Sequence, residues 1–129
     1  MNVLLDTCAL LWVAEADAKL SRPARDAIDR AERRFVSHAS VWEFVIKLRI
    51  GALTINHDFV DFVSKQIPDA GFDYLPILLT HFVSLHGLPL HGKHRDPFDR
   101  LLIAQALTEK LPIISSDEQF DQYGVQRIW

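Results

Sequence analysis

The chain has 129 residues, with 14 Lys and Arg against 17 Asp and Glu, so its formal net charge is −3. The length fits a single domain over residues 1–129, and the 49% hydrophobic content excludes a disordered tail or linker. The negative charge excludes a strongly basic domain, which is the simplest signature of a nucleic-acid-binding protein.

Apolar runs and helical patterns alternate along the whole chain. In chain order the sequence predicts a strand at 3–5, a helix at 8–16, a helix capped by Ser21, a strand at 35–37, helices at 40–50 and 59–67, a strand at 72–77, a helix at 80–86, a polar loop at 91–95, a helix at 96–110, and strands at 112–115 and 125–128. Gly51 and Pro68 are the expected ends of two of these helices. This alternation predicts an α/β fold with a parallel sheet.

The start of the chain and its single cysteine bear on where the protein works. The first basic residue comes well after Asp6, so the start does not resemble a secretory signal. The stretch 74–91 has no Asp, Glu, Lys or Arg, but it contains prolines and polar residues and falls short of the ~20 apolar residues that span a membrane. Cys8 alone cannot form an internal disulfide or a zinc site of several thiolates, and we expect it to be buried. We expect a soluble cytoplasmic protein without a membrane segment.

Four acidic residues stand at equivalent ends of the predicted elements. Asp6 and Asp117 each follow a strand, and Glu43 and Asp99 each lie in the first turn of a helix. In a parallel sheet the carboxyl ends of strands and the helix starts that follow them meet at one edge, where ligands bind. We therefore expect the four carboxylates to converge in one cleft.

Converging carboxylates repel one another, so a cation is expected among them. Mg²⁺ prefers carboxylate oxygens, and Mn²⁺ takes similar ligands. One or two such ions held by carboxylates support hydrolysis of a phosphodiester by an activated water. With four of the 17 acids in one cleft, the rest of the chain carries 14 basic against 13 acidic groups, a nearly neutral surface.

Each acid also has a purely local interpretation. Ser40 and Glu43 have the spacing of a capping box, and Glu43 and Lys47 have that of a helical ion pair. Asp6 and Asp117 have the character of turn residues. The residues of the next helix fit a cap at Asp96 and a favourable helix-dipole contact at Asp99.

Four segments, in order and over almost the whole chain, match the motifs of one family. They are Leu4-Leu5-Asp6-Thr7, Ser40-Val41-Trp42-Glu43 with the following Gly51-Ala52-Leu53, Asp96-Pro97-Phe98-Asp99 continuing to Ala106, and Pro112-Ile113-Ile114-Ser115-Ser116-Asp117. In these segments the chain resembles the PIN-domain ribonucleases, and among them the VapC-type toxins of toxin–antitoxin modules.

The resemblance implies a three-layer α/β/α sandwich around a central parallel β-sheet. It also implies Mg²⁺- or Mn²⁺-dependent cleavage of RNA that leaves a 5′-phosphate and a 3′-hydroxyl. The implied partners are the RNA substrate, a cognate antitoxin that binds DNA and covers the acidic cleft, and a second copy of the chain in a homodimer.

The resemblance assigns roles to individual residues as well. Asp6, Asp99 and Asp117 would hold the ion, and Glu43 would ligate it or orient the attacking water. Thr7 and Ser116 would hydrogen-bond the carboxylates or a metal-bound water. Asp96 is an additional acid of this subgroup with a supporting role.

A polar, basic loop precedes the Asp96 helix. Its cations, Lys93 and Arg95, with Arg100 beyond it, are candidate phosphate contacts at the rim of the acidic cleft. A solvated loop without ligand contacts is the alternative. His91 and His94 could bind a metal, but neither a cysteine nor another histidine pair completes such a site.

Other functions are compatible with the same fold. A noncatalytic partner-binding PIN module would not need the intact acids. A DNA-directed nuclease uses the same metal chemistry, because only contacts to the 2′-hydroxyl distinguish the sugars. A phosphoacceptor receiver domain would need an acidic pair after the first strand and an Asp after the third, and the chain has neither.

Overall fold

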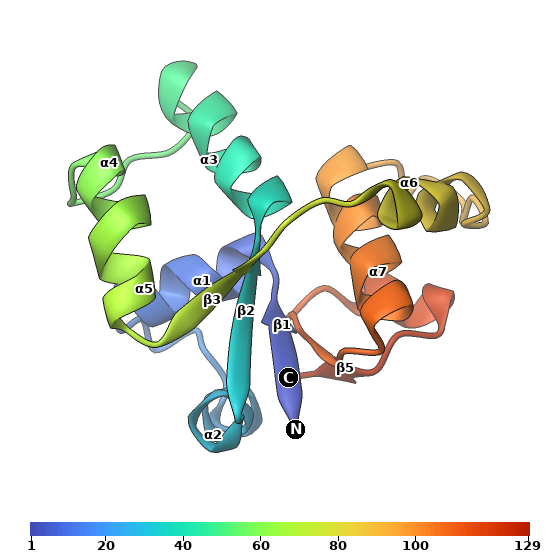
Figure 1. Ribbon diagram of the computed structural model, residues 1–129, viewed down its shortest axis with the longest axis horizontal. Coiled ribbons are helices and arrows are strands. Elements are labelled where there is room, and N and C mark those ends of the chain that lie inside the picture. The colour runs from blue at the N-terminus through green and yellow to red at the C-terminus, as the bar shows by residue number, and fades with distance from the viewer.

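The computed structural model describes residues 1–129 as a five-stranded parallel sheet with helices on both sides (Figure 1). The strands are β1 (Asn2–Leu5), β2 (Arg33–Ser37), β3 (Phe72–Leu75), β4 (Ile113–Ile114) and β5 (Arg127–Ile128), in the order β3-β2-β1-β4-β5. All neighbouring pairs are parallel. The predicted α/β/α sandwich around a parallel sheet is confirmed.

The helices follow the predicted order, with boundaries that differ by a few residues. They are α1 (Thr7–Ala14), α2 (Arg22–Arg30), α3 (His38–Arg49), α4 (Phe59–Asp61), the π-helix η1 (Phe62–Gln66), α5 (Ile67–Asp69), α6 (Leu79–His86), α7 (Pro97–Glu109) and the 3₁₀ helix η2 (Glu118–Tyr123). In Figure 1, α6 and α7 lie on the opposite side of the sheet from α1, α4 and α5. None of the helices is both long and apolar enough to cross a membrane.

Two hydrophobic cores occupy the two faces of the sheet. Val3 and Leu5 belong to one core and Leu4 to the other, because successive side chains of a strand point to opposite faces. Phe44 of α3 fills the first core, and Phe120 of η2 fills the second. Burial on both faces explains why β1 is an unbroken apolar run.

Two predicted helix boundaries are wrong for identifiable reasons. The helix expected to begin at Ser40 begins at His38, because the Ser37 hydroxyl caps it and accepts from the Ala39 amide at 2.9 Å. The helix expected to end before Pro68 continues to Asp69. The π-helix before Pro68 widens the hydrogen-bond ladder, which gives room for a residue that lacks an amide donor. Gly51, at φ 75°, follows α3 as predicted.

The connections that follow β1 and β4 leave toward opposite faces of the sheet. The connection from β1 leads into α1 over one face, and the connection from β4 leads into η2, whose Phe120 packs on the other face. The two strands are directly paired, and the Asp6 amide donates to the Ile114 carbonyl at 3.0 Å. Such a point in a parallel sheet opens a crevice at the carboxyl ends of the strands.

Candidate active site

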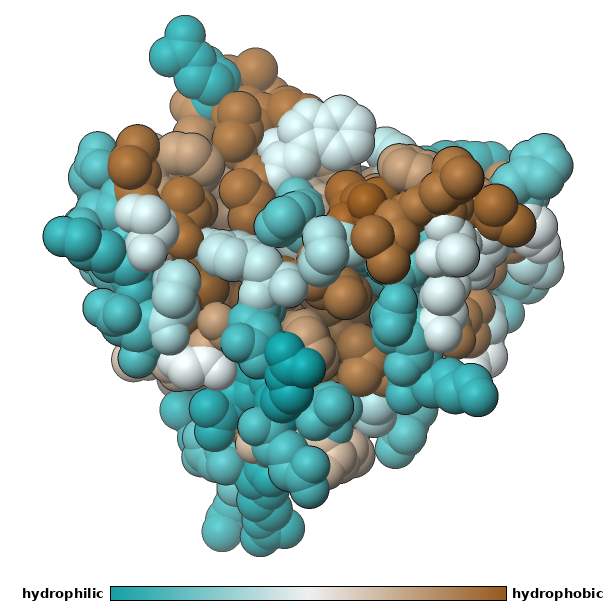
Figure 2. All heavy atoms as spheres, viewed as in Figure 1, coloured by the Kyte–Doolittle hydropathy of each residue, from teal (hydrophilic) through white to brown (hydrophobic).

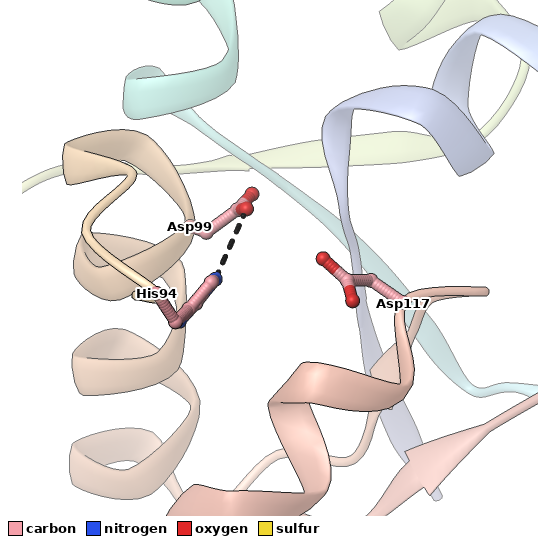
Figure 3. A group of neighbouring side chains, drawn as sticks. All are labelled: His94, Asp99 and Asp117. Atoms are coloured by element: carbon pink, nitrogen blue, oxygen red, sulfur yellow. Dashed lines mark hydrogen bonds and ion pairs between the residues drawn. The ribbon is translucent and has the colours of Figure 1, made fainter. Parts of the chain in front are cut away.

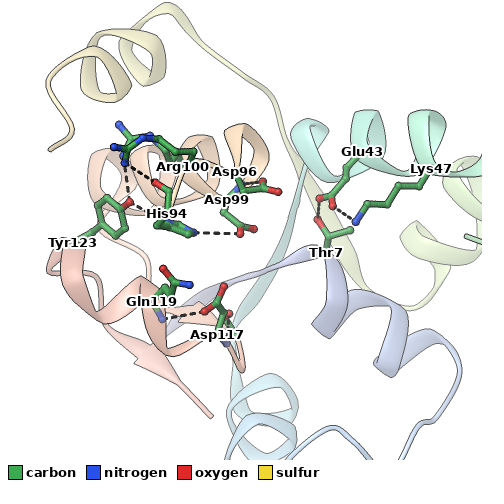
Figure 4. A network of polar contacts seen from close by, with 12 residues as sticks. Thr7, Glu43, Lys47, His94, Asp96, Asp99, Arg100, Asp117, Gln119 and Tyr123 are labelled. Atoms are coloured by element: carbon green, nitrogen blue, oxygen red, sulfur yellow. Dashed lines mark hydrogen bonds and ion pairs between the residues drawn. The ribbon is translucent and has the colours of Figure 1, made fainter. Parts of the chain in front are cut away.

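The acids predicted to converge are gathered at this crevice. Asp6 stands between β1 and α1, Asp99 lies in the first turn of α7, and Asp117 follows β4 and precedes η2. Glu43 lies in the second turn of α3 rather than the first. In Figure 4, Asp99 and Asp117 lie on one side of the site, and Thr7 and Glu43 lie opposite them.

Asp6 is, with Glu43, one of the two buried carboxylates of this group. Its side chain caps α1 by accepting from the Ala9 amide at 2.7 Å, and the residue is only 7% exposed. Burial raises the pKa of Asp6 to about 6, against the hydrogen bonds from Ser115 and Ala9, and the carboxylates of Asp117 and Glu43 raise it further. The fold therefore holds Asp6 where its negative charge is unfavourable without a cation.

The negative charge of Asp99 is unfavourable for the same reasons. Burial raises the pKa of Asp99 to about 7, and the neighbouring carboxylates, Asp96 first, add to the shift. Its own amide donates to Asp96 Oδ1 at 2.9 Å, so Asp96 is the N-cap of α7 as the sequence indicates. Asp96 is exposed and contributes to the site through its charge.

Glu43 is buried and held by side chains from two helices. The Thr7 hydroxyl lies 2.7 Å from Glu43 Oε1 and 3.0 Å from the Ser40 hydroxyl. Lys47 Nζ lies 2.6 Å from Glu43 Oε2. The capping box predicted for Ser40 and Glu43 is absent, because Ser37 caps the helix, whereas the Glu43–Lys47 pair is present.

Asp117 and the two serines before it form the part of the site that follows β4. Asp117 accepts from the Gln119 amide at 3.0 Å and is partly buried. The hydroxyl expected from Ser116 comes instead from Ser115, which hydrogen-bonds Asp6 and accepts from the Asp117 amide at 3.0 Å. Ser116 is exposed, because it is the first residue past the end of β4 to turn toward solvent.

His94 is the residue of the site that sequence reasoning did not assign. Ligand atoms of His94, Asp99 and Asp117 all lie within 4.8 Å of one another. Figure 3 shows these three side chains grouped at the start of α7 and the end of β4. Sequence reasoning required a second histidine or a cysteine to complete a metal site, whereas the structure supplies two carboxylates. The one signal in the sequence is the position of His94, in the loop that leads directly into the helix of Asp99.

Of the three predicted phosphate contacts, two remain at the surface. Lys93 and Arg95 are exposed. Arg100 is buried and donates to the carbonyls of Leu88 and Pro89, so the structure does not place it on the rim. Outside this group, Cys8 is exposed, and the expectation that it is buried is wrong, because its position in α1 faces away from the core.

The donor set fits a divalent cation with a preference for oxygen. Three carboxylates lie together, two of them with pKa values raised by burial and by neighbouring carboxylates, and an imidazole stands beside them. Replacing protons by a cation relieves both causes of the shifts. Mg²⁺ and Mn²⁺ suit carboxylates, and Mn²⁺ also tolerates an imidazole.

The sequence pattern of the PIN domain matches residues 3–126. VapBC2 from Rickettsia felis, bound to a promoter DNA fragment, superposes with a TM-score of 0.68 at 8% identity, with 100% of each chain covered. VapBC-1 from nontypeable Haemophilus influenzae gives 0.65 at 14% identity, over 98% of this chain and 96% of that one. A toxin–antitoxin complex from Klebsiella pneumoniae gives 0.60 at 16%, over 89% and 86%. No curated protein matches this chain.

Proposed function

The chain belongs to the PIN domain family, whose members are generally nucleases, and we propose that it is a Mg²⁺- or Mn²⁺-dependent endoribonuclease of the VapC toxin type. The observation that carries the proposal is the group of acids at the carboxyl ends of β1 and β4. Asp6 and Asp99 lie there with pKa values raised to about 6 and about 7. Their ionised forms are therefore unfavourable unless a cation is bound.

Asp6, Asp99 and Asp117 would hold the ion. When bound, a divalent ion lowers the pKa of a water and neutralises charge on the scissile phosphate. Glu43 orients the attacking water. Thr7 and Lys47 each bind one oxygen of its carboxylate, so its orientation is set before substrate arrives.

The exposed cations of the loop before α7 offset the repulsion between the acidic site and the phosphates of the substrate. Lys93 and Arg95 are exposed a few residues from Asp99. They bind backbone phosphates of RNA on either side of the scissile bond, and these contacts position the strand without reading its bases.

The proposed toxin role is based on the structurally similar proteins. The Klebsiella structure is a toxin–antitoxin complex, and the Rickettsia structure is bound to promoter DNA. A cognate antitoxin that also binds DNA is therefore the proposed inhibitor of this chain, and a second copy is its proposed partner. Figure 2 shows apolar surface available for such contacts near α3 and α6, where the exposed residues are Trp42, Val45, Ile46, Leu78, Leu79, Phe82 and Val83.

The decisive experiment measures cleavage of one sequence offered as single-stranded RNA and as DNA, with Mg²⁺, with Mn²⁺ and with EDTA. The parent protein is compared with Asp6→Asn and Asp99→Asn, and with Asp69→Asn, an exposed acid remote from the crevice, as the matched control. We expect RNA cleavage with either metal, none with EDTA, and losses of at least about 100-fold for the two site variants only.

Each other outcome rejects a stated part of the proposal. Equal cutting of the DNA makes the protein a nuclease without sugar preference, and cutting by both site variants shows that the metal site is misassigned. Purified protein that cuts neither polymer but binds a co-expressed partner is a binding module. Light scattering in solution tests the homodimer, which has twice the 14.8 kDa mass of one chain.

A further inference from the structure

Four side chains form a continuous row of hydrogen bonds that ends on Asp99. Arg100 Nη1 lies 3.2 Å from the Tyr123 hydroxyl, and that hydroxyl lies 2.7 Å from His94 Nδ1. His94 Nε2 lies 3.4 Å from Asp99 Oδ2. Arg100, Tyr123 and His94 are 9%, 8% and 5% exposed, so water competes little for these bonds (Figure 4).

The chemistry of the first member gives the row a direction. A guanidinium only donates, so the Tyr123 oxygen accepts from Arg100. The hydroxyl proton of Tyr123 then has His94 Nδ1 as its acceptor, because its two polar contacts are with Arg100 and His94. A neutral imidazole that accepts at Nδ1 carries its proton on Nε2, where it points at Asp99.

The opposite arrangement leaves a buried donor without a partner. If His94 Nε2 were a metal ligand, Nδ1 would carry the proton and would donate to Tyr123. The tyrosine oxygen would then face two donors, and its own proton would lack an acceptor in a buried place. The row therefore favours His94 as a donor to Asp99 over His94 as a ligand.

The row also connects the two elements that carry neighbouring acids. Asp99 and Arg100 are consecutive in α7, while Tyr123 ends η2, which begins after Asp117. Fixing Tyr123 to His94 and Arg100 therefore fixes η2 against α7. The distance between Asp99 and Asp117 depends on this attachment.

We propose that Arg100, Tyr123 and His94 form a positioning relay that holds Asp99 by its Oδ2 atom, directs its other oxygen to the ion and sets its separation from Asp117. The relay rests on the proposed function for its use of the ion. His94 is in this view a positioning residue, and the imidazole itself stays outside the coordination sphere.

The first test reads the tautomer and needs no metal. Protein with ¹⁵N-labelled histidine is examined by NMR for the protonated nitrogen of His94 at neutral pH. We expect the proton on Nε2 in the parent, and a mixture of tautomers in Tyr123→Phe, which removes the hydroxyl and keeps the ring. A parent protein with its His94 proton on Nδ1 overturns the relay.

The second test measures Mn²⁺ affinity by calorimetry in variants of His94 whose side chains place a hydrogen-bond donor at different positions. The amide of His94→Gln reaches about the place of Nε2, whereas that of His94→Asn reaches only the place of Nδ1. We expect His94→Ala and His94→Asn to bind Mn²⁺ about 10–100-fold more weakly, and His94→Gln to stay within a few-fold of the parent. His86→Gln, an exposed histidine on α6, is the control and binds as the parent does.

Pulsed EPR of bound Mn²⁺ separates a positioning residue from a ligand. We expect no coupling from a directly bound imidazole nitrogen in the parent, and such a coupling that disappears in His94→Gln overturns the relay. If the parent binds Mn²⁺ and all His94 variants bind it equally, the relay fails and the nuclease proposal stands. If the parent binds no Mn²⁺ and cuts no RNA, the proposed function fails, and the tautomer still decides whether the row exists.

Discussion

Replacing Asp99 by Asn removes the carboxylate with the largest rise in pKa among the acids of the crevice. We expect Asp99→Asn to make the metal-free protein more stable at pH 8 while it abolishes metal binding. Burial and the charges of Asp96, Asp6, Glu43 and Asp117 raise the pKa of Asp99, and all of them oppose the ionised form. An Asn side chain of the same shape carries no charge and can still accept from His94.

The size of the gain follows from the pKa. Each tenfold change in proton affinity corresponds to about 1.4 kcal/mol, so a rise from 3.8 to about 7 costs the ionised, metal-free fold about 4 kcal/mol at pH 8. Side-chain relaxation and water in the crevice reduce this limit, and we expect about 1–3 kcal/mol, or several degrees in the unfolding temperature. The sign reverses at a Mn²⁺ concentration of about 1,000 times the Kd, because only the parent then gains about 4.1 kcal/mol.

The pH dependence distinguishes this cause from a general effect of the substitution. The folded state binds the Asp99 proton more tightly than the unfolded state does, so the parent becomes more stable as the pH falls through about 7 toward 3.8. The advantage of Asp99→Asn is therefore greatest at pH 8 and shrinks steadily toward pH 4.

Urea unfolding of both proteins, with Asp69→Asn as the control, measures this difference in EDTA and in Mn²⁺. A difference that does not depend on pH, or an Asp99→Asn protein less stable than the parent at pH 8, refutes the reasoning.

Four further substitutions have expected outcomes. Gln105→Leu removes a fully buried amide that bonds the Pro76 carbonyl and lowers the free energy of unfolding by about 2–4 kcal/mol in urea. Phe120→Ala leaves a cavity in the second core and lowers the free energy of unfolding by about 3–5 kcal/mol in the same assay. Lys93→Ala and Arg95→Ala, each in the Asp99→Asn background, weaken RNA binding and reduce the salt slope by about 1, measured by fluorescence anisotropy at unchanged unfolding temperature. Unchanged RNA affinity in both would remove the proposed phosphate rim.

The sheet and the grouping of acids were predictable because they depend on patterns that persist over many residues. An apolar run such as Val3-Leu4-Leu5, buried on both faces, has few stable alternatives to a central parallel strand. Once the strands are parallel, the residue after each strand lies at the same edge of the sheet. Asp6 and Asp117 could therefore be placed together from the sequence without knowledge of any side-chain contact.

The unpredicted features depend on which of several equivalent local bonds is made. Ser37 and Ser40 are both suitable helix caps, and only the end of β2 decides that Ser37 takes the role. Ser115 and Ser116 differ by one position, and the pleat of β4 decides which hydroxyl reaches Asp6. His94 could not be assigned because its partner Tyr123 lies 29 residues away on η2.

The local interpretations of the acids and their functional interpretation are not alternatives. Asp6 caps α1 and Asp117 caps η2, each by accepting from an amide at the start of the element that follows its strand. Capping orients one oxygen of a carboxylate toward backbone amides and leaves the second oxygen for another partner. It also sets the negative charge at the positive end of a helix, which offsets part of the repulsion among the acids. The bonds that make Asp6 and Asp117 good helix caps therefore also offset part of the electrostatic repulsion among the carboxylates when no metal is bound. For this reason a strand followed by a capping acid is an informative signature of such a site.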